Sequence, residues 1–133
     1  MRSNIETIAR DFILALENRV SVEEILSFYH PEIEQTEYPN TLTRNKAVRK
    51  LEDIKIAFEK GGKVLQKEKY EILNLFSFGN TVFVEAIWTG TLAIPIGNLK
   101  AGEAMIANFA QVFEFKDDKI YKQRNYDCFE PFS

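Results

Sequence analysis

The chain has 133 residues, of which 45% are hydrophobic and 28% charged, and its formal net charge is −3. This length and composition suit one globular domain spanning residues 1–133. The acidic balance argues against a nucleic-acid-binding protein, and no apolar stretch approaches the roughly 20 residues of a membrane span. The single cysteine, Cys128, and the lack of a basic and apolar leader predict a cytoplasmic protein.

Two helices are predicted at the start of the chain. Ser3 and Glu6 form a capping-box pattern, in which a hydroxyl and a carboxylate satisfy backbone N–H groups at a helix start. Ser21 and Glu24 repeat this pattern and begin a short second helix, which we expect to end near residues 30–31.

A short strand and a third helix are predicted next. Residues 32–38 are polar and compatible with a strand, and Pro39-Asn40 turns the chain. Thr43 then caps a helix with apolar side chains at helical spacing. Gly61-Gly62 is expected to end this helix, because glycine adopts the left-handed conformation without a steric penalty.

The second half of the chain is rich in β-branched and aromatic residues in alternation. Four long strands are predicted, at 64–78, 81–94, 103–116 and 119–129. The connection 95–102 contains Pro and two Gly and is expected to be a loop at the rim of a pocket. Helices followed by long antiparallel strands predict an α+β fold, in which the sheet curls into a cone that the helices close.

The last hairpin can be paired residue by residue if Asp117-Asp118 forms its turn. Small side chains belong on the concave face, where helices or a ligand need room. Simple pairing then sets Asn108 opposite Asp127 on that face, and a shift by one residue would exchange the two faces. The predicted polar row on the inner wall consists of Asn108, Gln123, Asn125 and Asp127.

The strand at 81–94 has two distinct faces. Trp88 shares one face with small apolar residues and is expected to point inward, whereas Phe83 points outward. Together with Phe109, Phe113 and Phe115, Phe83 would form an aromatic patch on the convex side. Such a patch usually marks an interface, so the sequence predicts a homodimer packed sheet against sheet.

Several segments resemble the SnoaL-like branch of the nuclear transport factor 2-like superfamily. The resemblance covers nearly the whole chain and follows the order of the predicted elements. The segments that carry it are 29–32 (YHPE), 112–120 (VFEFKDDKI) and 124–127 (RNYD). It implies a cone-shaped α+β domain that is usually dimeric.

The resemblance also implies a range of activities, because members include polyketide cyclases, ketosteroid isomerases, dehydratases, hydrolases and inert binding modules. In the cyclases an acid on the final strand acts as general acid and base, and Asp127 matches that position. These cyclases also use a histidine on the preceding strand, where this sequence has none. The ketosteroid isomerases place a carboxylate base near the early strand, which Glu34 or Glu37 could supply.

The candidate catalytic residues are therefore Asp127, Glu37 and Tyr38. A carboxyl on an apolar wall has a raised pKa and can exchange protons near neutral pH. Glu37 and Tyr38 precede a turn and are expected at the mouth of the pocket, where they could hold a carbonyl or hydroxyl group. Candidate ligand-binding residues are Asn125, Gln123, Asn108 and Trp88.

Two functions remain open at this point. The first is an isomerase, cyclase or dehydratase that acts on a small, mostly apolar carbonyl compound. The single histidine and the single cysteine lack the spacing of metal ligands, so no metal is predicted. The sequence also contains no nucleotide-binding motif, so no cofactor is predicted. The second is a binding module that holds a ligand without chemistry. A weaker third alternative is recognition of a protein partner through the convex aromatic face.

Overall fold

The computed structural model describes residues 4–132, so the predicted cap at Ser3 lies outside the described residues. Three helices and six strands follow one another in the order that the sequence predicts, with one short strand added. The helices are α1 (Asn4–Glu17), α2 (Val22–Leu26) and α3 (Leu51–Val64). The strands are β1 (Tyr29–Glu37), β2 (Ala47–Arg49), β3 (Leu65–Phe78), β4 (Thr81–Leu92), β5 (Ala104–Lys116) and β6 (Lys119–Phe129).

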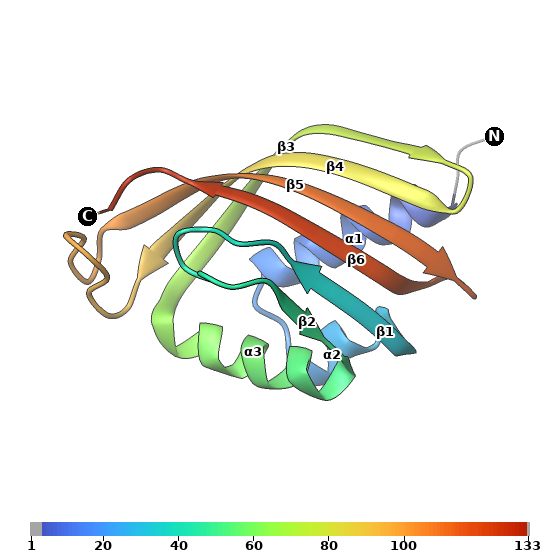
Figure 1. Cartoon of the computed structure of the whole chain (residues 1–133), viewed down its shortest axis with the longest axis horizontal. Coiled ribbons are helices and arrows are strands. Elements are labelled where there is room, and N and C mark those ends of the chain that lie inside the picture. The colour runs from blue at the N-terminus through green and yellow to red at the C-terminus, as the bar shows by residue number, and fades with distance from the viewer. Residues whose placement is uncertain (1–3, 133) are drawn as a thin grey trace.

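All six strands form one curved sheet in the order β2-β1-β6-β5-β4-β3. The helices gather on its concave side, with α1 beneath the long strands and α3 at the open end (Figure 1). This confirms the predicted α+β cone. The prediction of a purely antiparallel sheet was wrong for one pair, because β1 runs parallel to β6. That pairing brings the first and last strands side by side.

The concave face is buried because the long strands alternate in hydrophobicity. Along β4, Val82, Val84, Ala86 and Trp88 are all buried, which confirms the predicted inner face. Phe12 of α1 packs on this face and makes edge-to-face contact with Phe113 at 5.8 Å between ring centroids. Burial of the apolar stripe of α1 against the sheet stabilises the fold.

The predicted register of the last hairpin was wrong by one residue on β5. Next to the turn, Lys116 pairs with Lys119 as predicted. Tyr121 is then an extra residue on β6, so that Glu114 pairs with Lys122. A bulge of this kind moves every later residue of the partner strand to the other face. Asp127 therefore lies opposite Phe109, and β6 keeps its predicted inner face while the faces of β5 are exchanged.

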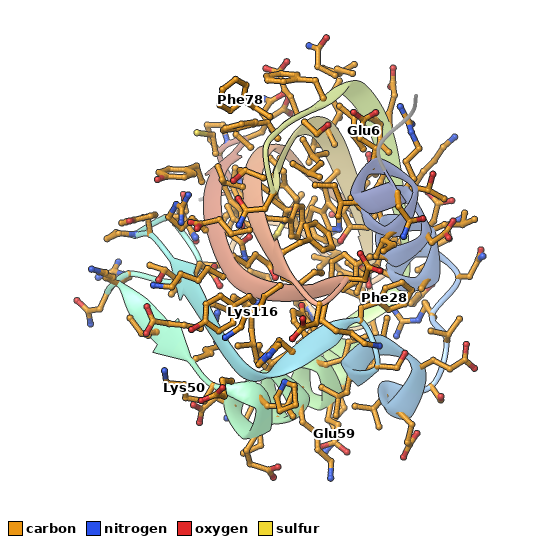
Figure 2. All side chains as sticks on the ribbon, turned by 90° about the vertical axis from the view of Figure 1, so that its right-hand side faces the viewer. Glu6, Phe28, Lys50, Glu59, Phe78 and Lys116 are labelled. Carbon is orange, nitrogen blue, oxygen red and sulfur yellow. The ribbon has the colours of Figure 1, made fainter. Side chains whose placement is uncertain are left out.

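The exchange also changes the predicted aromatic patch. Phe109, Phe113 and Phe115 point inward, and Phe113 and Phe115 are part of the core. The convex face keeps a smaller apolar patch, where Phe76 stacks on Phe83 at 5.2 Å between ring centroids. Phe78, which is 82% exposed, projects into solvent at the end of β3 (Figure 2).

The segment before α3 differs from the prediction. Residues 47–49 form β2, which pairs with the otherwise open edge of β1, so the helix begins at Leu51 rather than after Thr43. Asp53 caps the N-terminus of α3, where its carboxylate accepts a hydrogen bond from the backbone N–H of Lys50 at 2.9 Å. Gly61 and Gly62 lie inside the helix and do not end it.

The boundary between α2 and β1 was also predicted too late in the chain. Ser21 caps α2 as predicted, since its hydroxyl accepts the N–H of Glu24 at 3.2 Å. The helix already ends at Leu26, and His30 belongs to β1. The backbone of this region must extend early, because Phe28 accepts a hydrogen bond from Ile120 of β6 at 2.9 Å.

The loop between β4 and β5 is held against the C-terminal segment. Gly97 has a φ of +58°, and its missing side chain makes room for the backbone of Phe132. The N–H of Asn98 donates to the carbonyl of Phe132 at 2.7 Å. Ile96 of this loop lines the cavity described below, which supports the predicted position at a rim.

Candidate functional site

A cavity of about 490 Å³ lies between the concave face of the sheet and the helices. This volume falls within the range of small-molecule sites. Apolar side chains from α1, α3, β4 and β5 form most of its wall. The polar groups on it come mainly from β1 and β6, which the parallel pairing sets side by side. Its polar and ionisable lining residues are Tyr29, Gln35, Glu37, Thr43, Arg49, Glu68, Tyr70, Gln111, Gln123, Asn125 and Asp127.

Asp127 is the least satisfied polar side chain of the cavity wall. Its Oδ1 atom is buried and has no hydrogen-bond partner among the described residues. Burial, and then the negative charge of Glu37, raise the pKa of Asp127 to about 7. The carboxyl is thus present in both its acid and its ionised form near neutral pH, which is the property that a general acid or base requires.

Glu37 lies on the same wall but has the opposite character. Burial alone would raise the pKa of this carboxyl, but hydrogen bonds from Asn40, Arg49 and Thr43 and the charge of Arg49 outweigh burial and lower it. Arg49 donates at 2.8 Å to one oxygen, while Asn40 and Thr43 each donate at 2.9 Å to the other. Glu37 is therefore a fixed carboxylate whose oxygens are already occupied.

A row of amides runs from this ion pair to Asn125, two residues before Asp127 on β6. Arg49 donates to the oxygen of Gln35 at 3.2 Å, and the nitrogen of Gln35 donates to Gln123 at 3.2 Å. The nitrogen of Gln123 then donates to the oxygen of Asn125 at 2.8 Å. Gln35 and Gln123 each accept a hydrogen bond through the side-chain oxygen and donate one through the side-chain nitrogen. Successive hydrogen bonds of this kind polarise one another in a low-dielectric interior. The last donor, Nδ2 of Asn125, has no acceptor in the part of the chain that is described.

Glu68 forms a second polar point on the opposite side of the cavity. Trp88 donates to its Oε1 at 3.0 Å, and the hydroxyl of Tyr70 lies 3.4 Å from the same oxygen. Arg19 lies 3.6 Å from the other oxygen. Burial, followed by the charges of Glu68 and Asp127, raises the pKa of Tyr70, so this phenol stays protonated.

The structure brings five of the seven predicted site residues to the cavity. Asp127, Glu37, Gln123, Asn125 and Trp88 all line it.

Tyr38 and Asn108 do not line the cavity, so their predicted placement was wrong. Tyr38 directly follows Glu37, the last residue of β1, and stacks on Tyr126 at 4.7 Å between ring centroids. Asn108 is exposed because the bulge in the hairpin turns it to the convex face.

Sequence reasoning missed Tyr29, Gln35, Arg49, Glu68, Tyr70 and Gln111. For Gln35 a signal exists, since it lies two residues before Glu37 and therefore on the same face of β1. Gln111 would have followed from a correct register. Arg49 had no such signal, because its position depends on β2, which the sequence analysis assigned to a helix.

Residues 4–132 contain no group of three or more His, Cys, Asp or Glu side chains that could hold a metal ion. The helices of residues 4–132 also include none with the length and apolarity of a membrane span.

Comparison with known proteins agrees with this fold. The sequence model of the SnoaL-like domain family matches residues 9–123, and the chain belongs to this family. None of the curated proteins matches the chain in sequence.

Solved structures share the fold at low sequence identity. A candidate hydroxylase, AclR from Streptomyces galilaeus, has a TM-score of 0.78 and 15% identity, covering 96% of this chain and 80% of its own. IdmH, a candidate polyketide cyclase from Streptomyces antibioticus, has a TM-score of 0.79 and 12% identity over 94% and 92% of the two chains. TerC, co-crystallised with polyporic acid, has a TM-score of 0.72 and 16% identity over 96% and 92%.

Proposed function

We propose that this protein binds a small, mostly apolar carbonyl compound in its cavity and isomerises, cyclises or dehydrates it by proton transfer. The observation that carries the proposal is the buried Oδ1 of Asp127, which has no partner among the described residues and belongs to a carboxyl with a pKa near 7. An unpaired polar atom in an apolar wall is unfavourable unless a ligand satisfies it.

Asp127 and Asn125 have complementary roles in this proposal. Ionised Asp127 removes a proton from the carbon next to the carbonyl, and the C–H electron pair moves to form an enolate. Nδ2 of Asn125 donates a hydrogen bond to the oxygen on which negative charge develops. Protonated Asp127 then returns the proton at another carbon, which completes an isomerisation, or to a leaving hydroxyl, which completes a dehydration.

Arg49 and Gln35 are positioning residues in the same proposal. Both amides between Arg49 and Asn125 accept a hydrogen bond from the preceding donor, which fixes the direction in which Asn125 donates. Glu37 holds Arg49, and its negative charge adds to burial in raising the pKa of Asp127. It has no free oxygen with which to act as a second base.

The comparisons support a small ligand without identifying it. TerC was co-crystallised with polyporic acid, and a protein from Catenulispora acidiphila with a ketosteroid isomerase-like fold was crystallised with trimethylamine. From these two structures we infer for this chain only that its cavity binds a small molecule. No cofactor enters the proposed reaction.

The test is exchange of the α-proton of cyclic and linear ketones for deuterium, followed by NMR. The wild type should catalyse exchange with a rate that rises as pH passes through 7, and Asp127→Asn should lose at least about 100-fold of it. Asp118→Asn, in the exposed hairpin turn, is the matched control and should keep the wild-type rate. Full exchange by Asp127→Asn would remove the proposal.

A binding module without chemistry is the alternative. The lack of a histidine on β5 favours it, since the cyclases of this family use one. It predicts that Asp127→Asn alters ligand affinity or stability while no ketone exchanges protons above the background rate.

We further propose a homodimer through the convex face. Phe76, Phe83 and Val112 line a shallow hollow of about 220 Å³ there, and Phe76 is 57% exposed. An isologous dimer would cover the same face on both subunits. Light scattering at micromolar concentration should give twice the monomer mass, and Phe76→Glu should give a monomer, whereas Leu14→Glu on exposed α1 should not. A monomeric wild type would contradict this proposal.

A reducing location such as the cytoplasm also remains our proposal. Cys128 is an exposed free thiol, which oxidising compartments do not favour. Fractionation of the source cells, with the protein found only in an oxidising compartment, would contradict it.

A further inference from the structure

A second hollow adjoins the cavity between the C-terminal ends of α1 and α3 and the start of β3. This cleft has a volume of about 260 Å³. Five of its lining residues also line the cavity, so the two spaces share a wall. The shared residues are Leu16, Phe58, Gly61, Leu65 and Glu68.

Gly61 lies at the junction of the two hollows. It is inside α3, where glycine is less favourable than alanine, and its backbone does not require glycine, since its φ is not positive. Apart from its chain neighbours and the backbone of α3 itself, no heavy atom of the described residues lies within 4 Å of the position that a Cβ would occupy. Packing and backbone conformation therefore leave this glycine unexplained, whereas an open connection between cavity and cleft accounts for it.

The cleft is apolar inside and closed by one long side chain. Leu16, Val20 and Phe58 supply its apolar lining. Arg19 crosses it, donating to the carbonyl of Gly62 at 3.2 Å and lying 3.6 Å from Glu68. Ion pairs that are partly exposed contribute little to stability, so displacing Arg19 is inexpensive.

We propose that the cavity has a second opening, at Gly61, which leads into the cleft. This passage takes the apolar tail of an elongated, uncharged ligand, and the carbonyl head of that ligand lies at Asn125 and Asp127. The inference rests on the proposed function and adds the shape of the substrate. Most polar groups of the cavity lie along β1 and β6, whereas the passage is lined by apolar groups apart from Glu68, whose carboxylate is held by Trp88 and by Arg19 at the outer edge. A compact ligand would have no use for such a passage, whereas a linear alkyl ketone fills both parts.

The test is a chain-length series of 2-alkanones, from 2-hexanone to 2-dodecanone, measured by displacement of the neutral fluorescent probe N-phenyl-1-naphthylamine. Each methylene that becomes buried should tighten binding about fourfold. In the wild type this gain should continue to the long members. In Gly61→Leu the short members should bind as in the wild type, and the gain should stop at an intermediate length.

Two further variants complete the experiment. Lys60→Leu adds the same side chain at an exposed position of α3 and should keep the wild-type profile. Arg19→Ala should speed association of the long members several-fold and leave the short ones unchanged. Circular dichroism and thermal unfolding establish that each variant is folded before its profile is compared.

The failure of this inference differs from that of the proposed function. Identical chain-length profiles for the wild type and folded Gly61→Leu would overturn the passage, while binding of the short ketones would leave the head site intact. If Asn125→Leu weakens all members by a similar factor, the head site is supported whatever the tail does. No binding of any member to the wild type would overturn both.

Discussion

Glu37 and Asp127 line the same cavity from neighbouring parallel strands, one as a fixed carboxylate and the other as a carboxyl that titrates near pH 7. The difference comes from their partners, because donors occupy both oxygens of Glu37 whereas Oδ1 of Asp127 has none among the described residues. The negative charge of Glu37 adds to the effect of burial on Asp127. One strand pair thus supplies both a constant charge and a proton-exchanging group.

Asp127 should make the stability of the protein depend on pH. Its pKa is 3.8 when unperturbed and about 7 in the folded chain. Below pH 4 the Asp127 carboxyl is protonated in both the folded and the unfolded chain. Between pH 4 and 7 only the folded chain keeps this proton, so the free energy of unfolding should fall as pH rises. Asp127→Asn should remove this slope and be more stable than the wild type by about 2 to 4 kcal/mol at pH 8. Urea unfolding from pH 4.5 to 8 measures both effects.

The control for this measurement is Asp118→Asn, whose side chain lies in the exposed turn between β5 and β6. It should keep the slope of the wild type. A pH slope that survives in Asp127→Asn would show that another group titrates in this range.

Glu37 should stabilise the fold through Arg49. Glu37→Gln leaves a partly buried guanidinium without its 2.8 Å partner and should lower the free energy of unfolding by about 2 to 3 kcal/mol at pH 7. Because the pKa of Glu37 is lowered, this contribution is present above its ordinary pKa and is lost as pH falls through the lowered value. Glu34→Gln breaks the exposed pair with Lys50 and should change stability by less than about 0.5 kcal/mol. Equal losses in the two variants would contradict this account.

Gly97 should be far less tolerant of a side chain than Gly79, although both have φ close to +60°. A Cβ on Gly97 would lie 2.0 Å from the carbonyl oxygen of Phe132, whereas nothing lies within 4 Å at Gly79. Gly79→Ala should therefore cost about 1 to 2 kcal/mol from backbone strain alone. Gly97→Ala should cost at least about 2 kcal/mol more, because the C-terminal segment must move. Urea unfolding of the two variants gives the difference directly.

Gly61→Ala should stabilise the protein by about 0.5 to 1 kcal/mol, because alanine favours the helix and its methyl group would enter open space. Gly62→Ala is the matched comparison and should gain a similar amount, with its new methyl 3.7 Å from Arg19. Thermal unfolding followed by circular dichroism measures both. A destabilised Gly61→Ala would mean that the space beside Gly61 is not open.

Much of the architecture follows from local patterns in the sequence. Alternation along residues 81–94 correctly predicted the inner face of β4, because a buried face needs apolar side chains at every second position. The boundaries of β6 were predicted to the residue, since a tight turn precedes it and alternation runs through it. Asp127 was placed inward by pairing it with Asn108 on the face of the small side chains of β5; the bulge changes this pairing, but Asp127 still lines the cavity.

Other features depend on contacts that local patterns do not contain. The bulge at Tyr121 leaves no trace in composition, yet it decides that Gln111 and not Asn108 faces the cavity. Strand β2 forms because the edge of β1 needs a partner, which overrides the helical spacing of Ala47 and Leu51. Arg49 was missed for that reason, and with it the origin of the amide row.

The pairing of β1 with β6 also has a consequence for synthesis on the ribosome. The amide row needs Gln35 and Arg49 from β1 and β2, and Gln123 and Asn125 from β6. Long-range pairing of this kind forms late, because loop closure precedes any gain from the contacts. The cavity wall is therefore incomplete until β6 has been synthesised, and a nascent chain stalled before residue 119 would present the unpaired inner edge of β1 to chaperones.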